Sequence, residues 1–118
     1  MAKPIDFWFS IGSTYTFLSV MRLEAAEREN GISFTCRPFS VRAIMIEQNN
    51  VPFRGKPVKM AYMWRDIARR AEARGRTTML PAPYPLEGFD LANQVAVLAA
   101  GEGWCLTYAK AFYRRWFQ

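Results

Sequence analysis

The hydrophobic and polar positions of the first forty residues change period twice. Residues 4–9 are dense in aromatic side chains and alternate only weakly, which predicts a buried strand. From Thr14 apolar residues recur at helical spacing until Asn30-Gly31, a stop signal for a helix. Residues 32–38 then alternate apolar and polar positions up to Pro38. This order predicts a βαβ unit with parallel strands and a right-handed crossover.

The rest of the chain predicts helices and loops. We expect helices over residues 40–48, 58–74, 91–100 and 104–117. Residues 49–57 and 81–85 are rich in turn formers and predict loops. Both strands of the βαβ unit would be sheet edges, and residues 114–118 contain no stop signal for the last helix. The pattern therefore predicts the front part of a larger α/β fold.

Length and composition narrow the class of protein. The chain has 118 residues, of which 51% are hydrophobic, enough for one modest core. No apolar run is long enough to cross a bilayer, and the first residues lack the apolar core of a signal peptide. We therefore expect a cytoplasmic protein with no membrane partner. Cys36 and Cys105 lie far apart and outside any Cys-x-x-Cys pattern, which favours two buried reduced thiols over a disulfide or a metal site.

The net charge of +6 is compatible with a nucleic-acid partner, an anionic substrate or a solvated basic face. Five arginines cluster around the helix predicted over 58–74, and no aromatic residues are interleaved with them as base stacking requires. We therefore favour a solvated face and expect no nucleic-acid partner. The chain has no histidine, which excludes a Ser-His-Asp triad, histidine ligation of a metal and imidazole acid–base catalysis.

Ser13 is the candidate functional residue of the first βα junction. It follows Gly12, where the predicted strand ends and the predicted helix begins. The free N–H groups and the dipole of a helix N-terminus favour an anion there. A serine at such a junction is also a common N-cap. These residues leave a capping role and an anion-binding role open.

Two segments resemble one known family. The run Asp6-Phe7-Trp8-Phe9, followed by Ser13-Thr14-Tyr15-Thr16-Phe17-Leu18, resembles the opening of 2-hydroxychromene-2-carboxylate isomerases and kappa-class glutathione transferases. Their typical motif here is Ser-Pro-Tyr-Ser and an aromatic residue. Asn50-Val51-Pro52, with Pro57-Val58-Lys59-Met60-Ala61-Tyr62 and Asp66, resembles the family's Asn-x-Pro-Pro, Pro-x-Lys-x-x-Tyr and following Asp. Thr14 and Phe53 replace two of the family's prolines.

The resemblance implies a fold. Members of this family have a DsbA-like thioredoxin fold that is split by an inserted helical domain. Residues 1–40 would be the N-terminal half of the thioredoxin-like domain, and residues 41–118 an incomplete helical insertion domain. The C-terminal strands of the thioredoxin fold would be missing from this chain, which would correspond to the N-terminal portion of a family member.

The resemblance also implies glutathione as cofactor and a small aromatic molecule as substrate. Ser13 would hold the glutathione thiolate, which adds to a conjugated carbon, permits rotation about the former double bond and leaves again. The residues that would bind glutathione are Ser13, Thr14, Tyr15, Asn50 and Lys59. The residues that would line an aromatic substrate pocket are Trp64 and Tyr84. Outside the resemblance, Asn50 is an ordinary turn residue, Lys59 a solvated lysine, and Trp64 and Tyr84 core aromatics.

Three functions remain open at this point. A glutathione-dependent isomerase is preferred, with a kappa-class glutathione transferase as the near alternative. The chain is otherwise a non-catalytic thioredoxin-like fragment or interaction module. The exposed strand edges and the aromatic last helix also predict a possible homodimer.

Overall fold

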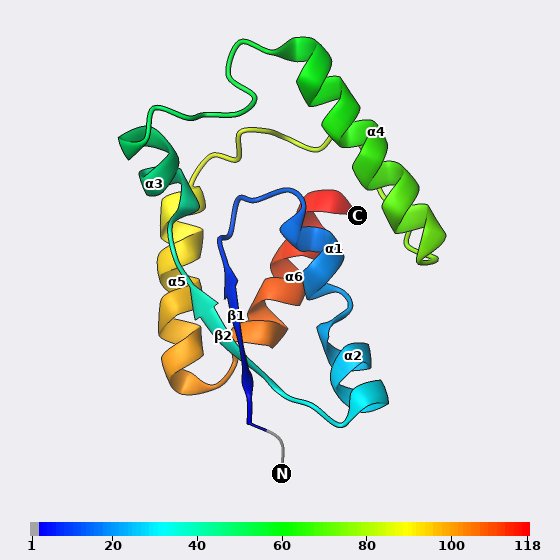
Figure 1. Ribbon diagram of the computed structural model, residues 1–118, viewed down its shortest axis with the longest axis vertical. Helices are drawn as coiled ribbons and strands as arrows, with labels where there is room; N and C mark the ends of the chain where they lie inside the picture. Colours follow the sequence, from blue (N-terminus) through cyan, green and yellow to red (C-terminus); the bar gives the residue numbers. More distant parts are fainter. Residues whose placement is uncertain (1–2) are drawn as a thin grey trace.

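The computed structural model describes residues 3–118 and contains two strands and six helices (Figure 1). The strands β1 (Ile5–Phe9) and β2 (Phe34–Pro38) are joined by the helices α1 (Thr16–Val20) and α2 (Leu23–Asn30). The remaining helices are α3 (Val41–Glu47), α4 (Pro57–Ala73), α5 (Phe89–Glu102) and α6 (Cys105–Phe117). The predicted α/β class and each predicted strand and helical region are confirmed, with differences in detail.

The two strands form a parallel sheet, as the βαβ pattern predicts. The register runs from Ile5 opposite Phe34 to Phe9 opposite Pro38. The prediction that the first strand is buried is wrong, because Trp8 is 63% exposed and Ile5 46% exposed, whereas Phe9 is buried. Alternate side chains of a strand point to opposite faces, and the described elements cover only the face that contains Phe9.

The crossover is a broken helix rather than the continuous one predicted from Thr14. The N–H of Arg22 bonds to the carbonyl of Ser19 at 3.0 Å, which ends α1 in a tight turn. The Met21 carbonyl accepts a hydrogen bond from the Arg76 guanidinium at 2.7 Å, in place of the backbone N–H that a continuous helix would supply. The break in the helix is therefore accompanied by a hydrogen bond from Arg76, a residue far away in the sequence. Gly31 ends α2 in the left-handed conformation (φ 63°), as predicted.

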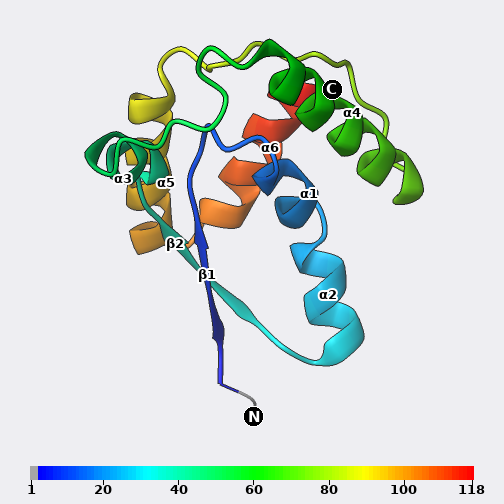
Figure 2. The same cartoon turned by 45° about the horizontal axis from the view of Figure 1, so that its top comes forward.

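One hydrophobic cluster unites the sheet, the crossover and the later helices. In both views α6 lies beside α1 and α5 flanks β2 (Figures 1 and 2). Phe17 of α1 stacks on Phe117 of α6 at a centroid distance of 4.6 Å, and α4 buries Met63, Trp64 and Ile67. Residues 3–40 and 41–118 thus contribute to the same core.

No helix of residues 3–118 is both long enough and apolar enough to cross a membrane.

Candidate functional site

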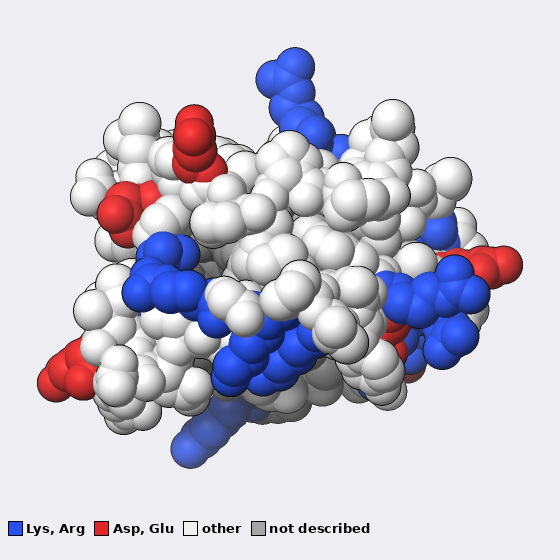
Figure 3. Space-filling view, turned by 90° about the horizontal axis from the view of Figure 1, so that it is seen from above, with Lys and Arg blue, Asp and Glu red and all other residues white. Residues whose placement is uncertain are grey.

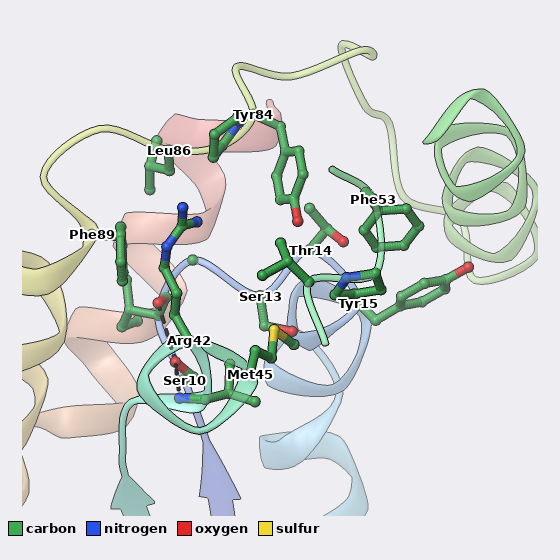
Figure 4. Close-up of a pocket in the computed structure, with 16 residues that line it drawn as sticks. Ser10, Ser13, Thr14, Tyr15, Arg42, Met45, Phe53, Tyr84, Leu86 and Phe89 are labelled. Atoms are coloured by element: carbon green, nitrogen blue, oxygen red, sulfur yellow. Dashed lines mark hydrogen bonds between the residues drawn. The ribbon is translucent and has the colours of Figure 1, made fainter. Parts of the chain in front are cut away.

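A cavity of about 200 Å³ lies at the carboxyl end of the two strands, where β1 leads toward α1 and β2 leads into α3. Its walls come from residues 10–15, the first turns of α3, residues 51–53, and the segment from Tyr84 to Phe89 (Figure 4). Ligands of α/β folds bind outside the carboxyl ends of parallel strands. The cavity is therefore the candidate functional site.

Asn93 of α5 fixes the start of the loop that follows β1. Its Oδ1 accepts a hydrogen bond from the Ile11 N–H at 3.0 Å, and its Nδ2 donates to the Phe39 carbonyl at 2.8 Å. The side chain is 7% exposed. Because both groups of the amide are used, Asn93 ties the end of β1 to the end of β2.

Tyr113 of α6 fixes the other end of the same loop. Its hydroxyl lies 2.7 Å from the Ser13 carbonyl and 3.3 Å from the Ser10 carbonyl. The side chain is fully buried, and burial raises the pKa of Tyr113, which keeps the phenol a neutral donor. Sequence reasoning gave Tyr113 no role, although a tyrosine on the apolar face of a helix needs a partner for its hydroxyl.

Gly12 is the tightest point of the loop. Its φ of +101° lies in the region that favours glycine, and a Cβ there would lie 3.2 Å from the Cβ of Phe89. The first residue of α5 therefore packs directly against the backbone beside Ser13.

Ser13 lines the cavity but does not cap α1. Its N–H donates to the Ser10 carbonyl at 3.1 Å in a turn, and α1 begins only at Thr16, with Tyr15 as its N-cap and no side-chain capping bond. The prediction that the helix starts at Ser13-Thr14 is wrong, because the turn after Ser10 comes first. With five residues, α1 also has a short dipole. Ser13 is therefore a candidate functional residue through its hydroxyl and not through a helix terminus.

Thr14 and Tyr15 join the loop to α4. The buried Thr14 hydroxyl donates to the Met63 sulfur at 3.1 Å. The Tyr15 ring points toward α4 (Figure 4), where its hydroxyl donates to Asp66 Oδ2 at 2.7 Å while Arg70 Nε binds the other oxygen at 3.1 Å. Burial and the bond to Asp66 raise the pKa of Tyr15 to about 12.

The other predicted site residues lie in and around the cavity. Tyr84 lines it, and burial raises the pKa of its phenol. Trp64 lies behind Tyr84 in the core, at a centroid distance of 6.1 Å, and is not part of the wall. Asn50 and Lys59 are exposed and lie outside the cavity; the Lys59 ammonium is 5.3 Å from the centroid of the Phe53 ring, which forms part of the wall.

Arg42 of α3 is a cavity residue that sequence reasoning missed. It is the only Lys, Arg, Asp or Glu among the cavity-lining residues of the described chain. Its guanidinium lies 5.2 Å from the centroid of the Phe89 ring. Arg42 lies in the first turn of the helix that follows β2. This position could have indicated a site residue, because that turn lies at the carboxyl end of a strand.

Comparison with known protein families agrees with this architecture. The sequence profile of the DSBA-like thioredoxin domain family matches residues 4–118. The chain belongs to this family. A search of curated proteins found no match. The match confirms the thioredoxin-like fold, and the DSBA-like group contains oxidoreductases as well as glutathione-dependent isomerases and transferases.

The two cysteines of this DSBA-like domain lie away from the cavity. Cys36 of β2 is half-buried, Cys105 at the start of α6 is buried, and both are free thiols. A hydrogen bond between them, together with burial, raises the pKa of Cys105. No cysteine lines the cavity among the described residues, and residues 3–118 contain no cluster of three or more side chains suited to bind a metal.

The bond from Tyr113 to the loop predicts a stability effect. Tyr113→Phe leaves the Ser13 and Ser10 carbonyls without this buried donor, so we expect the free energy of unfolding to fall by about 1–3 kcal/mol. Urea denaturation measures the change. Tyr62→Phe removes a hydroxyl from a side chain that is 70% exposed, and we expect it to have no effect. Equal stability of Tyr113→Phe and the parent protein would contradict this role.

The contact of Tyr15 with Asp66 predicts that the stability of the fold depends on pH in the alkaline range. The unfolded chain ionises Tyr15 near 10 and the folded chain near 12, so its contribution to stability is complete below pH 10 and is lost as the pH rises through about 12. Phenolate absorbance of the parent protein minus that of Tyr15→Phe should show a tyrosine that ionises near 12, and Asp66→Asn should move it toward 10. Circular dichroism confirms folding at each pH. Ionisation near 10 in the parent protein would disprove the contact.

Proposed function

We propose that this DSBA-like domain is a glutathione-dependent isomerase of the 2-hydroxychromene-2-carboxylate type. The observation that supports this most is a serine hydroxyl on the wall of a largely apolar cavity whose lining contains no cysteine. Disulfide exchange requires a thiolate, which Ser13 cannot provide. A thiol brought in by a small molecule would supply the missing sulfur.

The cavity and its surroundings suit part of a glutathione molecule. A volume of about 200 Å³ is below that of a typical pocket for a complete ligand, so it would accept a thiol group and a small ring but not the whole tripeptide. The tripeptide backbone would then extend past the wall formed by Val51, Pro52 and Phe53. Asn50 and Lys59, exposed just outside that wall, are suited to an amide and a carboxylate of the tripeptide.

The residues of this chain would act by positioning and by hydrogen bonding. Bound glutathione would supply a thiolate that adds reversibly to a conjugated carbon of an aromatic substrate. The Ser13 hydroxyl would donate a hydrogen bond to that sulfur and stabilise its charged form. Tyr113 and Asn93 would keep Ser13 in place by holding the loop on both sides. Tyr84 would provide an aromatic surface for the substrate ring.

A kappa-class glutathione transferase would use the same serine and the same cofactor. The two reactions differ in their product, because a transferase leaves glutathione bonded to the product and an isomerase releases it. Mass spectrometry of the product separates them. A non-catalytic interaction module would give neither product.

The thiol of bound glutathione provides the direct test of Ser13. We expect the pKa of this thiol, followed by thiolate absorbance, to fall by about one unit on binding to the parent protein, because the hydroxyl stabilises the thiolate. Ser13→Ala should lose this shift. Ser19→Ala, a serine change on the exposed side of α1, is the matched control and should keep it. An equal shift in Ser13→Ala, or no glutathione binding by folded parent protein in calorimetry, would overturn the proposal.

A further inference from the structure

The cavity contains one cationic side chain whose role the proposed thiol chemistry does not explain. We propose that Arg42 binds the carboxylate of a planar conjugated acid inside this cavity. The inference rests on the proposed function only in naming that acid as the substrate, because binding of the acid can be measured without glutathione.

Arg42 is held close to the loop that contains Ser13. Val41 donates its N–H to the Ser10 hydroxyl at 3.3 Å, which joins the start of α3 to that loop. The Ser40 hydroxyl caps the same helix by accepting from the Ala43 N–H at 3.3 Å. The Arg42 side chain reaches from α3 toward the segment that contains Tyr84 and Leu86 (Figure 4). A ligand on Arg42 would therefore share the cavity with the Ser13 hydroxyl.

The guanidinium is oriented by an aromatic ring. It lies 5.2 Å from the centroid of Phe89, the residue that also packs against Gly12. Stacking on a ring occupies one face of a guanidinium and leaves the donors at its edge available. These donors form a planar fork that matches the two oxygens of a carboxylate.

No acidic side chain of the described chain neutralises this charge. The ion pairs found over residues 3–118 involve Arg37, Arg70 and Lys110, not Arg42, and no Asp or Glu lines the cavity. In the view from above, the centre of the face is uncharged, Lys and Arg side chains form separate patches around it, and Asp and Glu lie toward the left and right sides (Figure 3). An anion approaching this face therefore meets little repulsion, and the half-buried position of Arg42 strengthens the attraction.

The other walls restrict the kind of anion. Apolar and aromatic side chains predominate, among them Ile11, Val51, Phe53, Leu86 and Phe89. A small hydrophilic anion would either leave these apolar surfaces in contact with water or place its own charge against them. Both arrangements are unfavourable in free energy. A flat apolar body with one carboxylate satisfies both Arg42 and the walls. The limited volume of about 200 Å³ fits a body of one or two rings.

Glutathione also has carboxylates, so two sources of this group must be distinguished. Lys59 lies outside the wall, next to the face of Phe53, and is the cation better placed for a carboxylate of the extended tripeptide. Arg42 lies within the cavity, where the substrate would be. We therefore assign the carboxylate on Arg42 to the substrate.

Calorimetric titration with trans-cinnamate, and with its uncharged analogue cinnamamide, tests the assignment in the absence of glutathione. We expect the parent protein to bind cinnamate more tightly than cinnamamide. Arg42→Gln should weaken cinnamate binding by about 10- to 100-fold and leave cinnamamide binding nearly unchanged. Arg42→Lys keeps the charge without the fork and should give an intermediate loss. Arg28→Gln, on α2 at the opposite end of the molecule from α3 (Figure 1), is the matched control and should bind as the parent does.

Several results would overturn the inference. They are no cinnamate binding by the folded parent protein, equal affinity for cinnamate and cinnamamide, and unchanged cinnamate binding in Arg42→Gln. Weaker glutathione binding with unchanged cinnamate binding in Arg42→Gln would assign the arginine to the tripeptide instead. If Ser13→Ala proves neutral while Arg42→Gln weakens cinnamate binding as expected, the carboxylate site stands and the glutathione proposal fails.

Discussion

Two buried hydrogen-bonding side chains, Asn93 and Tyr113, hold the loop on which the whole site depends. The loop from Ser10 to Thr14 leaves the sheet before any helix begins, so its buried N–H and carbonyl groups have no partners in regular structure. Asn93 satisfies the Ile11 N–H and Tyr113 the Ser13 carbonyl, across sequence separations of 82 and 100 residues. Without these hydrogen bonds, each of the two groups would lower the free energy of unfolding by about 1–3 kcal/mol. The helices α5 and α6 therefore define where Ser13 lies.

The same packing links the loop to the cavity. Phe89, the first residue of α5, packs against the Gly12 backbone on one side and lies under the Arg42 guanidinium on the other. Thr14 and Tyr15 fasten the far side of the loop to α4 through Met63 and Asp66. Ser13 and Arg42 line the same small, largely apolar cavity, and these contacts hold both residues in place. This arrangement is the physical basis for proposing thiolate and carboxylate recognition side by side.

Local patterns predicted the parts of the fold that depend on local physics. Period and turn chemistry predicted both strands, the stop at Gly31 and the helical region that becomes α4. They failed where distant groups decide the outcome. The hydrogen bond from the Ser13 N–H to the Ser10 carbonyl forms a turn, so α1 begins later than predicted. Arg76 donates a hydrogen bond to the Met21 carbonyl at the point where the crossover helix is broken. Asn93, Tyr113 and Arg42 were missed for the same reason, because their partners meet them only after folding.

The most direct test of this account is an amide NMR titration of the folded protein with glutathione. We predict the largest chemical-shift changes at the amides of Gly12 to Tyr15 and of Val51 and Phe53, which surround the cavity. The absence of any shift would contradict the account. Shifts confined to the separate groove lined by residues 78–83 and 115–118 would contradict it equally, because they would place the ligand away from Ser13.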